Sequence, residues 1–186
     1  EELGAQQAEA ESLLKDHRFE EAEQLTATLR DEQDPRLQQF VPWATDFYPQ
    51  IARSRDAATS RVVSLLQEAV KHEASYDYTS AINTLSQVSE TLRQRLLPDC
   101  SETVADAMGR VTALQTEQKR LEQLTKERIA NRQFTGLLPE VKKLLQLNPD
   151  RKDIQKLAKK LHERETKLRQ QRDAAIHQAE VFLREK

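Results

Sequence analysis

Three segments of the chain repeat one pattern, which begins at an aromatic residue. The segments are RFEEAEQLTATL, DYTSAINTLSQV and QFTGLLPEVKKL, and their aromatics are Phe19, Tyr78 and Phe134. Small or apolar residues follow three, seven and ten positions after the aromatic, namely Ala22, Ala81, Leu137, Leu85, Val141, Leu29, Val88 and Leu144. The first segment has Thr26 at the seventh position, where we expect the neighbouring Leu25 to take its place. Because these offsets share one face of a helix, each segment predicts a short amphipathic helix.

The composition extends this prediction to the whole chain. Glycine occurs only 3 times, and the common residues are strong helix formers. With 37% hydrophobic and 32% charged residues, the chain has too little apolar material to bury its helices on all sides. We therefore predict an all-α fold, arranged as an elongated, solenoid-like array of helical hairpins.

A proline follows each short helix and is expected to open a long one. These prolines are Pro35, Pro98 and Pro149. Asp34 and Asn148 are predicted N-caps that place proline at the first helical position. Asp99 is predicted to cap the second long helix, with Glu102 in capping-box spacing.

Seams of apolar residues predict the second and third long helices. The seam over residues 100–131 comprises Val104, Ala107, Val111, Leu114 and Leu121. The seam over residues 149–185 recurs every seven residues at Ile154, Leu161, Leu168, Ala175 and Phe182. In the middle of this last helix, HERETKLRQQRD (162–173) offers little apolar besides Leu168. Such a helix either bridges packed units through solvent or pairs with a second chain through a thin seam.

One repeat combines a short and a long helix, because the aromatics lie 59 and 56 positions apart. We predict three helical repeats, at residues 1–76, 77–132 and 133–186, the first with a kinked long helix and the third with a long charged helix. The stretch AEVFL at 179–183 is similar to AESLL at 10–14, so a fourth short helix is expected just past the last residue. Since the sequence also begins without Met, we expect it to be a region of a larger protein.

The stretch FVPWATDFYP (40–49) concentrates aromatic residues in an otherwise charged chain. We predict helix on both sides of it, with a break or kink near Pro42 and Pro49, because proline removes a backbone hydrogen bond. On the structural interpretation, Phe40, Trp43 and Phe47 fill the gap at the bend. On the functional one, an aromatic patch docks a partner, and its candidate residues are Trp43, Phe47 and Tyr48.

Charge and cysteine usage exclude several function classes. Acidic and basic residues nearly cancel, at 31 against 29, and are interspersed, which argues against a nucleic-acid-binding face. The single cysteine, Cys100, precludes an internal disulfide and favours a reducing, cytoplasmic compartment. No apolar run approaches the roughly 20 residues that span a bilayer, so no membrane insertion is expected.

Nothing in the sequence has the spacing of a catalytic or metal site. The histidines are scattered at His17, His72, His162 and His177, without a partner at ligand spacing. Cys100 near a helix start could be a reactive thiol, but a near-terminal position in a helical protein is the simpler interpretation. We therefore predict no metal, no cofactor and no enzymatic activity.

The third segment resembles the second helix of a tetratricopeptide repeat. In QFTGLLPEVKKLLQLNP the aromatic, the apolar positions and the Asn-Pro fifteen residues on follow that pattern. The period here is not 34 residues, and the first helices lack the Trp, Gly and Tyr positions. The likeness is confined to the turn.

A second resemblance covers most of residues 60–162. The phrases YDYTSAINTLSQVSETLR and LLPEVKKLLQLNPDRKDIQKLAKKL are similar to the helical region of large planctomycete-type signalling proteins. Those proteins join a serine/threonine kinase domain to other domains, such as a formylglycine-generating-enzyme-like one. The resemblance implies a non-catalytic connecting region. The kinase motifs themselves are absent from this chain.

These observations favour a helical scaffold, a module that binds a protein partner or flanking domains and spaces them apart. The alternative is a homodimerising coiled coil through residues 154–182, and the alternative of another class is an enzyme of unidentified type. We expect a monomer from the first interpretation and a dimer from the second.

Overall fold

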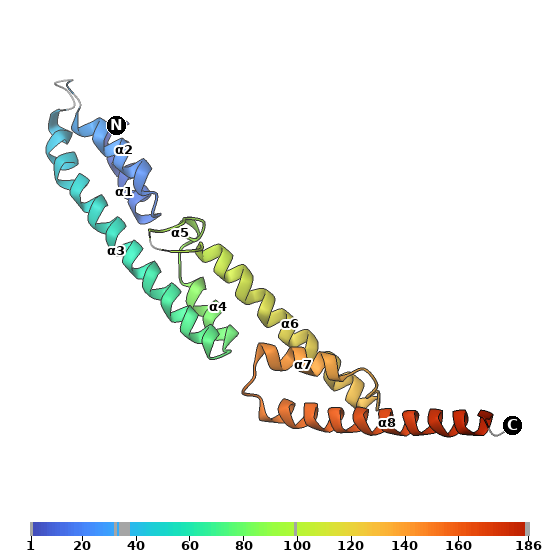
Figure 1. Cartoon of the computed structure of the whole chain (residues 1–186). Coiled ribbons are helices and arrows are strands. Elements are labelled where there is room, and N and C mark those ends of the chain that lie inside the picture. Colours follow the sequence, from blue (N-terminus) through green and yellow to red (C-terminus); the bar gives the residue numbers. More distant parts are fainter. Residues whose placement is uncertain (1, 32, 34–37, 99, 185–186) are drawn as a thin grey trace. The chain divides into compact units, whose positions relative to one another are not determined.

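The fold is described here by a computed structural model that covers residues 2–31, 33, 38–98 and 100–184 (Figure 1). The helices are α1 (Glu2–Lys15), α2 (Phe19–Arg30), α3 (Val41–Ala74), α4 (Tyr78–Ser86), α5 (Glu90–Arg93), α6 (Val104–Ala130), α7 (Leu138–Leu147) and α8 (Lys152–Arg184), with a 3₁₀ turn, η1 (Gln38–Phe40), before α3. Over those residues there is no strand, which confirms the predicted all-α class.

The chain divides into two compact units, Glu1–Thr112 and Ala113–Lys186. In the first unit α1 packs against α2, and the long helix α3 packs against both α2 and α4. Figure 1 shows α2 and α4 beside opposite ends of α3. In the second unit α7 packs against α8. The predicted division into three repeats remains a prediction, as does their elongated stacking.

The same turn precedes each of the three aromatic residues. His17, Tyr76 and Arg132 have φ of 59°, 61° and 56°, two positions before Phe19, Tyr78 and Phe134. At each turn the positive-φ residue donates its N–H to the carbonyl three residues back, at 2.9–3.2 Å, and the next residue donates to the carbonyl five back, at 2.8–2.9 Å. These paired bonds are a Schellman motif, which ends one helix and starts the turn toward the next.

The residues that the sequence places on one face of the short helices are buried. The residues three, seven and ten positions after Phe19 and Tyr78 are between 0 and 3% exposed. Those at the same positions after Phe134 are 0 to 1% exposed. The substitution by Leu25 is wrong, because Thr26 itself is 0% exposed and Leu25 is only half-buried. The Thr26 hydroxyl donates to the Ala22 carbonyl at 2.6 Å, so the threonine satisfies its polar atom within its own helix.

The long helices begin later than the prolines suggest. Helix α6 begins at Val104, where the Thr103 hydroxyl accepts the Asp106 N–H at 3.1 Å and the Thr103 N–H donates to the Asp106 carboxylate at 3.4 Å. This capping box replaces the predicted cap ahead of Glu102. Helix α8 begins at Lys152, not at Pro149, because the Asn148 side chain accepts the Asp150 N–H at 3.2 Å and closes a turn instead. Among the predicted caps and prolines, Asp34, Pro35 and Asp99 lie outside the described residues.

Helix α3 runs without a break through Pro49, so the predicted break near Pro42 and Pro49 is wrong, while the predicted kink stays a prediction. Pro42 lies in the first turn of α3, where its missing N–H would have no helical acceptor. Pro49 lies inside the helix, yet Ala44, Phe47 and Ile51 around it are 0, 7 and 0% exposed. Burial of these three residues on both sides of the proline offsets the lost hydrogen bond.

The core of the second unit joins α6, α7 and α8. Its buried members are Leu121, Leu137, Leu138, Val141, Leu144, Ile154 and Leu161, with Phe134 and Leu157 packed against them. Two arginines tie the turns around this core. Arg128 donates to the Gly136 carbonyl at 3.3 Å, and Arg151 donates to Glu122 at 2.7 Å and Asp153 at 2.8 Å. The Arg151 hydrogen bond lowers the pKa of Asp153 to about 2.

The predicted seams are buried only in part. In α6, Val104, Ala107, Val111 and Leu121 are 0 to 3% exposed and Leu114 is half-buried. In α8 the seam is buried at Ile154 and Leu161 but exposed at Leu168 and Phe182, by 52% and 72%. Every side chain from Thr166 to Arg184 is exposed.

Candidate interaction sites

Two aromatic residues of the stretch 40–49 stack on each other. The rings of Trp43 and Phe47, one helical turn apart on α3, stack with centroids 4.7 Å apart and an interplanar angle of 17°. Phe47 is 7% exposed and belongs to the core, whereas Trp43 and Phe40 are half-buried. Of the predicted partner-binding residues, Phe47 therefore has little surface to offer, and Trp43 keeps an accessible edge.

Tyr48 lies on a neighbouring face of α3, where an arginine from α2 covers it. The guanidinium of Arg30 lies 4.8 Å from the centre of the Tyr48 ring. Arg30 also donates to the Asp31 carboxylate at 2.9 and 3.2 Å, and that hydrogen bond lowers the pKa of Asp31. Tyr48 is half-buried under this arrangement. Partner binding by Trp43, Phe47 and Tyr48 remains a prediction.

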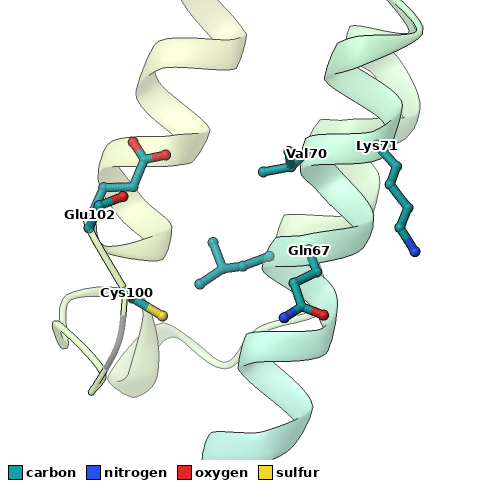
Figure 2. Close-up of a pocket in the computed structure, with 7 residues that line it drawn as sticks. Gln67, Val70, Lys71, Cys100 and Glu102 are labelled. Atoms are coloured by element: carbon teal, nitrogen blue, oxygen red, sulfur yellow. The ribbon is translucent and has the colours of Figure 1, made fainter.

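A pocket that the sequence did not signal lies in the first unit, between α3 and the segment that leads into α6 (Figure 2). Its volume is about 420 Å³, and it is lined by residues 66–67 and 70–71 of α3 and by residues 100–102. Val70 is 56% exposed, and Figure 2 shows its side chain directed toward the 100–102 segment. The surface that lines the pocket is mostly apolar.

The charged side chains that line this pocket either bind residues outside it or point away from Cys100. The Glu102 carboxylate accepts hydrogen bonds from Arg110 at 2.7 and 3.4 Å, and Arg110 also pairs with Glu73 of α3. These bonds raise the pKa of Arg110. Figure 2 shows the Lys71 ammonium directed away from Cys100. The half-buried Cys100 thiol therefore has no positioned base among the residues that line the pocket.

The histidines do not gather into a site. His17 lies in the first turn and meets Phe19 edge-on, with ring centroids 5.7 Å apart. His72 lies 3.8 Å from Glu68, one turn back on α3. His162 and His177 are exposed on α8. Within the described part of the chain, no three His, Cys, Asp or Glu side chains are grouped as metal ligands would be.

No helix in the described ranges combines the length and the apolar character needed to cross a bilayer.

Comparison with protein-family models, with curated proteins and with solved structures gives no match to this chain. The tetratricopeptide-like and kinase-associated interpretations therefore remain predictions made from the sequence.

Proposed function

We propose that this chain is a non-catalytic helical scaffold that binds a protein partner or flanking domains and spaces them apart. The observation that carries the proposal is helix α8. Its first part is anchored in the second unit by Ile154 and Leu161, which are 8% and 4% exposed. From Thr166 to Arg184 it continues as a helix whose side chains are all exposed. A helix that is packed into a core at one end and exposed to solvent at the other is suited to bridging two domains or to binding a partner.

The candidate sites support a non-catalytic role. The pocket beside Cys100 presents no nucleophile paired with a base, and in the aromatic stretch Trp43 stacks on Phe47 and Arg30 covers Tyr48. The signalling context, a connecting region in a multidomain kinase-type protein, rests only on the resemblance over residues 60–162. A hydrolase and nucleotide-binding screen that finds a stoichiometric ligand or turnover would contradict the proposal.

The spacer role can be tested by a distance measurement. In a Cys100→Ala background, spin labels at Lys156 and Glu180, both exposed on α8, should lie about 36 Å apart, since a helix rises 1.5 Å per residue. A single narrow distance distribution is expected. A broad distribution at shorter distances would mean that the outer half of α8 is not a rigid extension, and the spacer role would be lost.

The second candidate is a homodimeric coiled coil through residues 154–182. The observation in its favour is the exposure of Leu168 and Phe182 at heptad positions. Light scattering should give a monomer mass if the scaffold proposal is right. A dimer that dissociates on Leu168→Asp would favour the coiled coil. Leu161 is unsuitable for this test because it belongs to the core of the second unit.

A further inference from the structure

The outer half of α8 carries an exposed face made of small and large apolar residues. Leu168, Ala175, Ala179 and Phe182 follow one another at helical spacing on one side of the helix. Leu168 is 52% and Phe182 72% exposed, and both alanines are exposed. We call these four residues the α8 face.

Three pairs of consecutive helices, α1 with α2, α3 with α4 and α6 with α7, are called hairpins here and show how equivalent positions are buried elsewhere in the chain. In each hairpin, the first helix has a small residue nine positions before the aromatic. These residues are Ala10, Ala69 and Thr125, which are 0, 4 and 3% exposed. The short helices α2 and α4 each carry an alanine three residues after the aromatic, Ala22 and Ala81, and both are 0% exposed. A small residue on each arm lets the two helices approach closely.

Two residues of the α8 face, Ala179 and Phe182, align with apolar residues of α1, the first helix of the first hairpin. AEVFL at 179–183 aligns with AESLL at 10–14, which places Ala179 with the buried Ala10 and Phe182 with Leu13. Leu13 is 8% exposed beneath α2, whereas Phe182 is 72% exposed. Four residues earlier, Ala175 corresponds to Leu65 and Leu121 of the other two hairpins, which are 9% and 0% exposed, and to the half-buried Gln6 of α1.

Charge indicates which kind of short helix fits. Between residues 167 and 184, α8 carries the basic residues Lys167, Arg169, Arg172 and Arg184 and the acidic residues Asp173 and Glu180. Helix α2 has the opposite balance, with Glu20, Glu21 and Glu23 against Arg30. Helix α7 has one acidic and two basic residues, so it is a poorer electrostatic match.

We propose that the α8 face is a docking site for a short, acidic amphipathic helix of the α2 type. Such a helix begins with an aromatic residue and has an alanine three residues later and an apolar residue ten residues later. Pairing of two α8 helices is the less suitable occupancy. Arg164 and Gln171 stand at the intermediate heptad positions, where a stable coiled coil needs apolar residues. The docking site rests on the proposed scaffold function and specifies the partner's chemistry.

The test uses the whole chain and a synthetic peptide of residues 18–31, acetylated and amidated so that its ends carry no charge. An isolated helix of this length is only marginally stable, so binding is followed by NMR of the ¹⁵N-labelled chain at high peptide concentration. Saturable shift changes confined to residues 168–183 are expected. Ala179→Glu should weaken binding by roughly tenfold or more, because the carboxylate would be buried without a partner.

Two controls separate packing from charge attraction. Ala174→Glu adds the same charge to another exposed alanine of α8, turned roughly 140° away from Ala179, and should leave binding unchanged. A peptide with Ala22→Glu is more acidic than the original and should nevertheless bind less. If it binds equally well, the attraction is only electrostatic and the docking site is wrong.

Other outcomes also overturn the docking site. These are the absence of shift changes on α8, shift changes centred on α1 and α3, and an α8-dependent dimer. The first two leave the spacer role intact if the labels at residues 156 and 180 still report a rigid helix, whereas an α8-dependent dimer favours the coiled coil over the scaffold proposal. A broad distance distribution would instead remove the scaffold proposal itself.

Discussion

Three single residues hold the turns of this protein in a backbone region that usually takes glycine. His17, Tyr76 and Arg132 have φ near 60°, where a side chain with a Cβ costs about 1 kcal/mol or more. His17 and Tyr76 are half-buried, so their side chains take part in packing. Arg132 is exposed, which makes its turn the one in which backbone strain can be relieved with least effect on packing.

We predict that Arg132→Gly stabilises the second unit by about 0.5–1 kcal/mol. Glycine adopts this φ without strain, and the strain that is relieved exceeds the cost of glycine's larger conformational entropy in the unfolded state. Urea unfolding followed by far-UV circular dichroism would measure the change. Arg132→Ala keeps the Cβ and should give no gain. Equal stability of the Gly and Ala variants would show that the turn is not strained.

Two buried threonines form a matched pair. Thr26 and Thr125 are 0% and 3% exposed, but only Thr26 has a hydrogen bond for its hydroxyl. The Thr125 hydroxyl has no partner among the described residues. A buried, unpaired hydroxyl destabilises a fold by about 1–3 kcal/mol.

Thr125→Val should therefore raise the free energy of unfolding by about 1 kcal/mol, since it replaces an unpaired hydroxyl with a methyl group. Thr26→Val removes a satisfied hydrogen bond and should lower stability by about 0.5–1.5 kcal/mol. Urea titrations of both variants would give the two signs. Destabilisation by Thr125→Val would imply that its hydroxyl is satisfied after all.

At the scale of helices, the spacing of residues predicted the buried faces better than the helix ends. Positions three, seven and ten after each aromatic are all buried, because helical periodicity alone decides which residues share a face. The starts of α6 and α8 were misplaced, because they depend on which side chain captures a free N–H. Thr103 with Asp106 does so at α6, and Asn148 forms a separate turn before α8.

For the candidate sites too, residue spacing predicted some features, whereas others depend on tertiary packing. Phe47 lies three residues after Ala44 and four before Ile51, so helical spacing predicts that it shares their buried face. The pocket could not, because Val70 and Cys100 lie 30 positions apart and are brought together only by tertiary packing. The exposure of Leu168 and Phe182 was also not predictable, since a heptad pattern does not reveal whether a partner helix is present.

Helix α3 provides a prediction about its internal proline. Pro49→Ala restores a backbone donor and removes the ring's clash one turn back, so it should stabilise the first unit by about 1–3 kcal/mol. Unfolding followed by the fluorescence of Trp43, the only tryptophan, measures this unit. Pro42→Ala is the control, and a change within about 0.5 kcal/mol is expected because Pro42 lies in the first turn. Destabilisation by Pro49→Ala would mean that the proline sets the course of α3 needed for its packing.

At the scale of the whole molecule, the boundary between the two compact units falls within helix α6. The buried apolar residues of the second unit form one cluster on α6, α7 and α8 and on the residues just before α7. The buried residues of α1 to α4 belong to the first unit. Equivalent core positions in the two units can therefore be weakened one at a time.

Leu29 and Leu144 are such equivalents, each ten residues after its aromatic and 3% and 1% exposed. Truncation of a buried leucine to alanine costs about 2–5 kcal/mol, from lost burial and the cavity left behind. Leu29→Ala should lower the urea midpoint of Trp43 fluorescence, since both residues lie in the first unit. Leu144→Ala should leave that midpoint unchanged while part of the far-UV circular dichroism signal is lost at lower urea. If Leu144→Ala instead shifts the Trp43 transition as far as Leu29→Ala does, then α6 couples the units into one cooperative fold, and a partner that binds α8 would stabilise the whole chain.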